Sequence, residues 1–124
     1  MIGLLDSSVV IDVLREHPPA ENWLKSQGQL GVTRIVWLEV IEGAFNKRKQ
    51  REALKLLRRF ALVELTTPDM IWAVNTLIRT NLGYNVDAFD CLIASVSHRL
   101  QLPMYTTNMK HFTPLLGSLA QRPY

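Results

Sequence analysis

The residues with the clearest potential for chemistry are carboxylates that stand among apolar neighbours. Asp6 directly follows residues 2–5, an apolar run without alternation that is typical of a strand covered on both faces. A carboxylate at the carboxyl end of an inner parallel strand lies where open α/β sheets bind ligands. Ser7-Ser8 offers an N-cap for the helix that follows. A second interpretation of Asp6 is that it merely caps this helix itself, and on these residues alone the two interpretations stand equal. Further acids at the same edge of the sheet would favour the interpretation of Asp6 as part of a ligand-binding site.

Glu39 stands in the middle of a predicted helix over residues 34–45, with Ile35 and Gly43 one turn away on either side. An unpaired buried carboxylate costs several kcal/mol or takes up a proton, so a purely structural role explains Glu39 poorly. Glu42 lies about 60° around the helix and is better explained as an exposed charge near the helix end. Gly43 costs about 1 kcal/mol relative to alanine within a helix, which predicts a close approach of another backbone.

Asp90 presents the same problem in a predicted helix over residues 86–101. It is flanked by Val86 and Ile93 at one-turn spacing and has no cationic partner four residues away on the helix. Aspartate is also a poor residue for a helix interior, so a functional role is favoured. Asp87 lies in the first turn, where the helix dipole favours a negative charge, and this role is sufficient to explain it.

A polar loop follows the last predicted inner strand, residues 102–106. Thr106 offers a hydroxyl, Asn108 an oxygen and two donors, and His111 a base or a ligand. Taken alone, Asn108 is better explained as a turn residue. Because this loop leaves the carboxyl end of a strand, it is expected to open on the same edge of the sheet as Asp6.

Strands and helices alternate along the chain, which predicts the scaffold for these residues. Strands are expected at residues 2–5, 29–32, 61–65 and 102–106, and helices at 8–16, 20–27, 34–45, 47–60, 68–82 and 86–101. Residues after 106 are expected to form a loop and tail with at most one edge strand. Crossovers of this kind predict an α/β fold: a three-layer α/β/α sandwich with a mostly parallel central sheet of four to five strands, in one domain over residues 1–124.

Three carboxylates brought together repel one another by roughly 1 to 4 kcal/mol per pair, so a folded protein keeps such a cluster when a divalent cation neutralises it. Oxygen ligands favour Mg²⁺ or Mn²⁺ over zinc, and such an ion activates water and stabilises charge on a phosphodiester. A basic cluster over residues 47–59 suits a phosphate backbone, although a solvated helix face is the more common explanation of such a run. Together these features point towards a nuclease.

Composition sets the remaining limits. Hydrophobic residues make up 48% and charged residues 20%, with a net charge of +3, as in an ordinary folded domain. The one cysteine, Cys91, is expected to be a buried small hydrophobe in a reducing compartment. The N-terminus lacks the pattern of a signal peptide, and no apolar run approaches the ~20 residues that span a bilayer. A cytoplasmic protein without membrane contact is therefore expected.

Four motifs, in order and over essentially the whole chain, resemble those of the PIN-domain ribonucleases, and among them the VapC-type toxins of toxin–antitoxin modules. Leu4-Leu5-Asp6-Ser7-Ser8 resembles the opening strand and first acid of the family. Glu39-Val40-Ile41-Glu42-Gly43 is similar to its E-L-x-x-G helix, and Asp90-Cys91-Leu92-Ile93-Ala94-Ser95 to its D-x-x-I-A-A helix. The run from Thr106 to Phe112 is similar to its T-x-N/D-x-x-x-F loop. The resemblance selects Glu39 over Glu42 and Asp90 over Asp87.

The resemblance implies an Mg²⁺-dependent endoribonuclease, with Mn²⁺ as a substitute, which acts on RNA and leaves a 3′-hydroxyl and a 5′-phosphate. It further implies a homodimer that is held inactive by a VapB-like antitoxin in a higher assembly. Many relatives have an acid where this chain has Asn108, so we expect a single tightly held ion. A PIN-like module that binds RNA without cleaving it is the alternative, and residues 47–59 could meet either RNA or antitoxin. The implied catalytic residues are Asp6, Glu39, Asp90 and Asn108, and the implied metal ligands are Asp6, Glu39 and Asp90, with Asp87 and Asn108 as accessory ligands.

Overall fold

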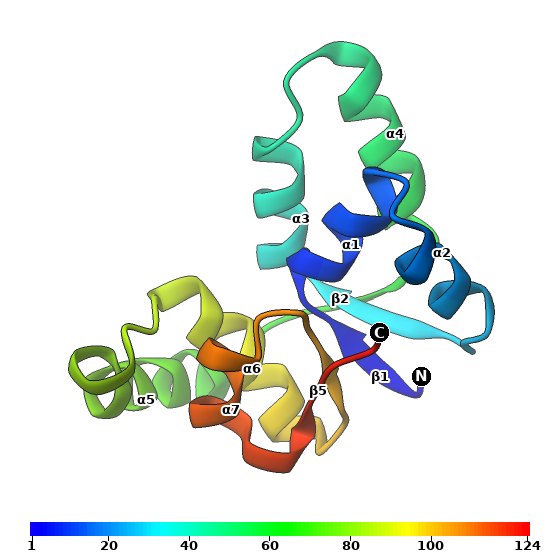
Figure 1. Ribbon diagram of the computed structural model, residues 1–124. Helices are drawn as coiled ribbons and strands as arrows, with labels where there is room; N and C mark the ends of the chain where they lie inside the picture. Colours follow the sequence, from blue (N-terminus) through cyan, green and yellow to red (C-terminus); the bar gives the residue numbers. More distant parts are fainter.

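Five parallel strands form the centre of the computed structural model, which describes residues 1–124 (Figure 1). Their order in the sheet is β3-β2-β1-β4-β5, so the first strand of the chain is the middle one. Leu4 of β1 pairs with Gly31 of β2 on one side and with Met104 of β4 on the other. The strands are β1 (Gly3–Leu5), β2 (Leu30–Thr33), β3 (Ala61–Val63), β4 (Met104–Tyr105) and β5 (Ala120–Gln121). The predicted parallel sheet is confirmed, at the upper end of the expected strand number.

Seven helices cover the two faces of this sheet, which confirms the predicted three-layer sandwich. Helices α1 to α4 gather on one side and α5 to α7 on the other (Figure 1). None of the helices combines the length and the apolar character that crossing a membrane requires. The helices are α1 (Ser7–Leu14), α2 (Pro18–Lys25), α3 (Arg34–Glu42), α4 (Lys47–Leu57), α5 (Thr67–Tyr84), α6 (Ala88–Leu100) and α7 (Met109–Leu116), and a 3₁₀ turn, η1, covers Gly117–Leu119.

The hydrophobic core holds the central strand from both faces. Leu4 and Leu5 of β1 and Met104 of β4 are almost completely buried, as their apolar sequence requires. Phe112 of α7 is the largest fully buried side chain. Asp6 therefore directly follows a strand that is held in the hydrophobic core.

Side-chain caps start α3 and α6, the helices that carry Glu39 and Asp90. Thr33 Oγ1 accepts from the Val36 N–H at 3.4 Å and starts α3, the helix that carries Glu39. Asp87 Oδ1 accepts from the Asp90 N–H at 2.8 Å and starts α6. Asp87 is thus the N-cap of α6 rather than a residue within its first turn, and α6 begins two residues later than predicted.

Two proline-containing segments differ from the predictions. Pro18 and Pro19 begin α2 instead of preceding it, because a residue in the first turn of a helix needs no backbone N–H donor. Residues after 106 were expected to lack a helix, but α7 continues through Pro114 and buries Phe112 and Leu115. The predicted edge strand is present as β5.

Several helix ends also differ. Helix α3 ends at Glu42 and α4 at Leu57, each three residues earlier than predicted, whereas α5 extends two residues further, to Tyr84. The close backbone approach expected at Gly43 is wrong. A Cβ there would meet only the carbonyl oxygens of Glu39 and Val40, at 3.5 and 3.6 Å, and Gly43 is simply the C-cap of α3.

Candidate metal centre

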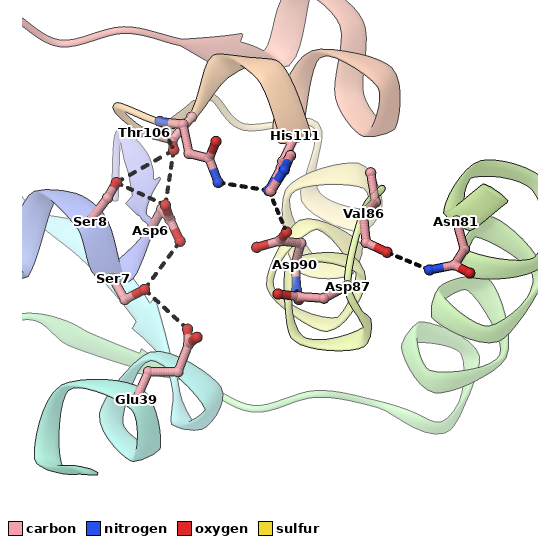
Figure 2. A network of polar contacts seen from close by, with 11 residues as sticks. Asp6, Ser7, Ser8, Glu39, Asn81, Val86, Asp87, Asp90, Thr106 and His111 are labelled. Atoms are coloured by element: carbon pink, nitrogen blue, oxygen red, sulfur yellow. Dashed lines mark hydrogen bonds and ion pairs between the residues drawn. The ribbon is translucent and has the colours of Figure 1, made fainter. Parts of the chain in front are cut away.

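Asp6 lies at the junction of β1 and α1 and is only 4% exposed. It occupies the N-cap position of α1, but its side chain accepts no capping hydrogen bond from the backbone. Its Oδ2 instead accepts from the hydroxyls of Ser8, at 2.8 Å, and Thr106, at 2.9 Å (Figure 2). Helix capping therefore does not account for the Asp6 carboxylate, and the predicted cap by Ser7 or Ser8 is wrong because both lie within the helix.

Glu39 reaches the same place from α3. The Ser7 hydroxyl donates to Glu39 Oε1 at 3.0 Å and lies 3.4 Å from Asp6 Oδ1, so one side chain links the two acids (Figure 2). Burial raises the pKa of Glu39 above its ordinary value; the hydrogen bond from Ser7 opposes this shift, and the charges of Asp6, Asp87 and Glu42 add to it. Glu42 itself is exposed, as expected.

Asp90 enters from the first turn of α6 and is 9% exposed. Burial raises the pKa of Asp90 to about 6, and the negative charges of Asp87 and Asp6 add to the shift, whereas His111 opposes it. Its Oδ2 is buried and lacks a hydrogen-bond partner, although His111 Nδ1 lies 3.2 Å away. The side chain that faces Asp90 Oδ2 thus comes from α7 and not from a neighbouring turn of α6.

The loop between β4 and α7 completes the site. The buried Thr106 hydroxyl, which donates to Asp6, also accepts from the Asn108 N–H at 2.9 Å. Ser8 Oγ accepts from the Thr107 N–H at 3.1 Å, which ties the loop to α1. The side-chain nitrogen of Asn108 lies 3.0 Å from His111 Nδ1. As expected, this loop opens on the same edge of the sheet as Asp6.

The site therefore consists of two groups of three residues. Ser7 joins Asp6 to Glu39 (Figure 2). His111 stands between Asn108 and Asp90. No group of three His, Cys, Asp or Glu side chains is close enough to enclose a metal ion as the side chains stand. Asp87, one of the two accessory residues, uses Oδ1 to cap α6.

Sequence reasoning gave Ser7 no role beyond helix capping and underestimated His111. The position of Ser7 directly after Asp6, in the first turn of a helix, was the available signal. For His111, the sequence offered only the choice between base and ligand.

The chemistry of these residues fits a hard divalent cation. Asp6, Glu39 and Asp90 are oxygen donors, and the latter two have pKa values raised by burial and by neighbouring negative charge. The unpartnered Oδ2 of Asp90 shows that its carboxylate is not fully satisfied by the protein. Mg²⁺ needs only a few protein carboxylates because it retains several of its waters.

Comparisons with known proteins place the chain in a family. A sequence comparison with curated proteins finds no match. Among solved structures, a toxin–antitoxin complex from Klebsiella pneumoniae is similar, with a TM-score of 0.83, 21% identity and 98% of each chain covered. VapBC2 from Rickettsia felis, bound to a promoter DNA fragment, gives a TM-score of 0.77 at 20% identity, with 91% of this chain and 92% of that chain covered. FitAcB from Neisseria gonorrhoeae gives 0.74 at 20% identity, with 91% and 93% covered.

At these identities the structural likeness shows the fold. The family itself is shown by the sequence model of the PIN domain, which matches residues 3–112. Asp6, Glu39, Asp90 and Asn108 all lie within the matched range. The chain belongs to the PIN-domain family.

Proposed function

We propose that this PIN domain is an Mg²⁺-dependent endoribonuclease, with Mn²⁺ as a substitute, and the toxin of a type II toxin–antitoxin module. The observation that carries the proposal is the convergence of Asp6, Glu39 and Asp90, from three separate elements, at the carboxyl end of the central strand. Burial and the negative charges of neighbouring carboxylates raise the pKa values of Glu39 and Asp90, and a divalent cation would reverse these shifts. The structural neighbours, which are toxin–antitoxin complexes, support the toxin role.

Asp6, Glu39 and Asp90 would hold the ion, and the surrounding hydroxyls fix their orientation. Ser8 and Thr106 hold one oxygen of Asp6, and Ser7 holds Glu39. When bound, the ion lowers the pKa of water and neutralises charge on the phosphodiester. In the proposed hydrolysis the oxygen of water attacks phosphorus in line and the bond to the 3′-oxygen breaks. The 3′-oxygen takes a proton, and the phosphate stays on the 5′ side.

Asn108 favours a site that binds one ion over a site that binds two. Its amide is neutral, so the site has three carboxylates rather than four to balance positive charge. The Asn108 side chain offers two N–H donors, which suit a phosphate oxygen or a water. A Mn²⁺ titration followed by calorimetry should show one tight site per chain, and two equally tight sites would contradict this part of the proposal.

The basic face of α4 supports a nucleic-acid substrate. Arg48 and Lys49 pair with Glu52, but five basic side chains around them are exposed and have no carboxylate partner. An unpaired row of cations binds a phosphate backbone without reading its sequence. We assign this role to Lys47, Arg51, Lys55, Arg58 and Arg59.

A groove between α1, α3 and α4 supports a VapB-like antitoxin as partner. Its volume is about 210 Å³, most of its lining is apolar, and Phe45 at its edge is 80% exposed. Such a groove suits the apolar face of an amphipathic helix. Coexpression with the antitoxin is expected to suppress RNA cleavage by the wild-type chain but to suppress cleavage by the Phe45→Glu variant less strongly.

A homodimer is supported by an apolar stripe along α5. Exposed apolar side chains recur there at spacings of three and four residues, which places them on one face of the helix. Monomeric proteins rarely leave such a stripe uncovered. The stripe consists of Ile71, Val74, Ile78 and Leu82, which are 57%, 57%, 74% and 96% exposed.

The nuclease proposal is tested by incubating purified protein with RNA, in Mg²⁺ and in EDTA. Cleavage is expected in Mg²⁺ only, and it should fall at least a hundredfold in Asp6→Asn, Glu39→Gln and Asp90→Asn. The Glu42→Gln variant, altered one turn from Glu39, is the matched control and should cleave as the wild type does. Binding of RNA without cleavage, unaffected by EDTA, would instead support the non-cleaving RNA-binding module.

A further inference from the structure

His111 is the one side chain that touches both Asp90 and Asn108. Its Nδ1 lies 3.2 Å from Asp90 Oδ2 and 3.0 Å from the side-chain nitrogen of Asn108. The ring is largely enclosed, with 27% of the side chain exposed. These contacts link α7 to α6 across the site.

The contact divides the two oxygens of Asp90 between different surroundings. Oδ2 is buried and has no hydrogen-bond partner, and the imidazole Nδ1 lies 3.2 Å from it. The other oxygen lies on the side that faces Asp6 (Figure 2). The imidazole therefore lies against one oxygen of Asp90 without a hydrogen bond to it, and the other oxygen is on the side of the remaining carboxylates.

The backbone holds His111 in place for this contact. The N–H groups of His111 and Phe112 both donate to the Asn108 carbonyl, at 3.2 and 3.1 Å. Phe112, the next residue, is fully buried in the core. The ring is thus anchored by the first turn of α7 and does not depend on a flexible loop.

We infer that His111 is a positioning residue of the metal centre, acting through Asp90 and Asn108. It fixes which oxygen of Asp90 faces the ion and holds the Asn108 amide beside it. Residues that contact a metal ligand and fix its orientation, without binding the metal themselves, typically contribute 10- to 100-fold to metal affinity. This inference rests on the proposed function, since it assumes that the carboxylates hold an ion.

This role differs from the two that the sequence offered, base or ligand. Nδ1 is already placed between two other side chains, so this nitrogen is not free to bind an ion or to face a substrate. Asn108 and Asp90 come from separate elements, and the imidazole sets their relative position. His111 thereby holds the side chain of Asn108, which stands at the position where many relatives have an acid.

The test is the affinity for Mn²⁺ alone, measured by calorimetry on the purified full-length chain without RNA. His111→Asn and His111→Gln form the matched pair, because the amide of asparagine reaches the position of Nδ1 and that of glutamine reaches the far side of the ring. His111→Gln is expected to bind Mn²⁺ about 10- to 100-fold more weakly than the wild type, and His111→Asn to stay within about threefold. Lys110→Ala, at an exposed neighbouring residue, should bind as the wild type does.

Urea unfolding in EDTA separates positioning from folding, because the two His111 variants, which both lack the imidazole, should unfold at similar midpoints although their affinities for Mn²⁺ differ. If His111→Gln binds Mn²⁺ as tightly as the wild type, or more tightly, the inference is wrong while the nuclease proposal stands. A greater loss in His111→Asn than in His111→Gln would also overturn it. A wild-type chain that neither binds Mn²⁺ nor cleaves RNA would overturn the proposed function itself.

Discussion

Replacing Asp90 with asparagine should stabilise the protein when no metal is present. Burial, together with the charges of Asp87 and Asp6, raises the pKa of Asp90 from 3.8 to about 6. A shift of roughly two units corresponds to about 3 kcal/mol, which the folded state loses when the buried carboxylate is ionised. Asparagine has nearly the same shape and carries no charge. The predicted gain from Asp90→Asn at pH 7.5 is therefore up to about 3 kcal/mol.

The direction of the pKa shift determines how the stability difference between Asp90→Asn and the wild type changes with pH. Because the folded-state pKa of Asp90 is higher than the unfolded-state value, the folded protein binds the additional proton between pH 4 and pH 6. The contribution of this carboxyl group to stability is therefore largest below about pH 4, falls as the pH rises to about 6, and is constant above that. The advantage of Asp90→Asn over the wild type should be about 1 kcal/mol at pH 4.5 and about 3 kcal/mol at pH 7.5.

Urea unfolding in EDTA at these two pH values measures the difference directly. Saturating Mg²⁺ should then raise the midpoint of the wild type at pH 7.5 and leave that of Asp90→Asn nearly unchanged, because the variant has lost a ligand. An Asp90→Asn protein that is less stable than the wild type at pH 7.5 would refute the reasoning. So would an advantage that is the same at both pH values.

Three further predictions concern other parts of the molecule. Asp69 is buried, but hydrogen bonds from Arg99 and from the start of α5 outweigh burial and lower its pKa. Asp69→Asn should therefore lower the free energy of unfolding in urea by about 2 kcal/mol at pH 7.5. This difference in stability should shrink as the pH falls below 4. Ile78→Asp on the α5 stripe should convert a dimer into a 14.2 kDa monomer in light scattering, and a wild type that is already monomeric would refute the dimer. The double variant Arg51→Glu/Lys55→Glu should weaken RNA binding in fluorescence anisotropy and make it less sensitive to salt, and an unchanged affinity would exclude this face of α4 as the RNA contact.

The carboxylates of the site could be found from the sequence because their signal is local. A charge among apolar neighbours, as at Asp6 and Glu39, conflicts with the pattern of its own element, and the conflict is visible within one or two turns. Asp90 was found in the same way. The parallel sheet could also be predicted from the sequence, because alternating strands and helices are compatible with few topologies.

The contacts between the acids could not be predicted, because they depend on elements that are distant in the chain. The imidazole beside Asp90 belongs to α7, which was not predicted and which contains Pro114, a residue that disfavours a helix interior. The ends of α5 and α6 are set by Asn85 and Gln101, with φ angles of 55° and 53°. Glutamine in particular is a weak sequence signal for the left-handed conformation, so these boundaries were placed imprecisely.

The strand order has a consequence for the synthesis of this protein. The middle strand, β1, leaves the ribosome first, but its neighbour β4 follows about a hundred residues later, with the Thr106 hydroxyl directly behind it. A nascent chain that stops before α6 has an open edge on β1 and only two of the three carboxylates. Chemistry at this centre would therefore become available only when nearly the whole chain has been made.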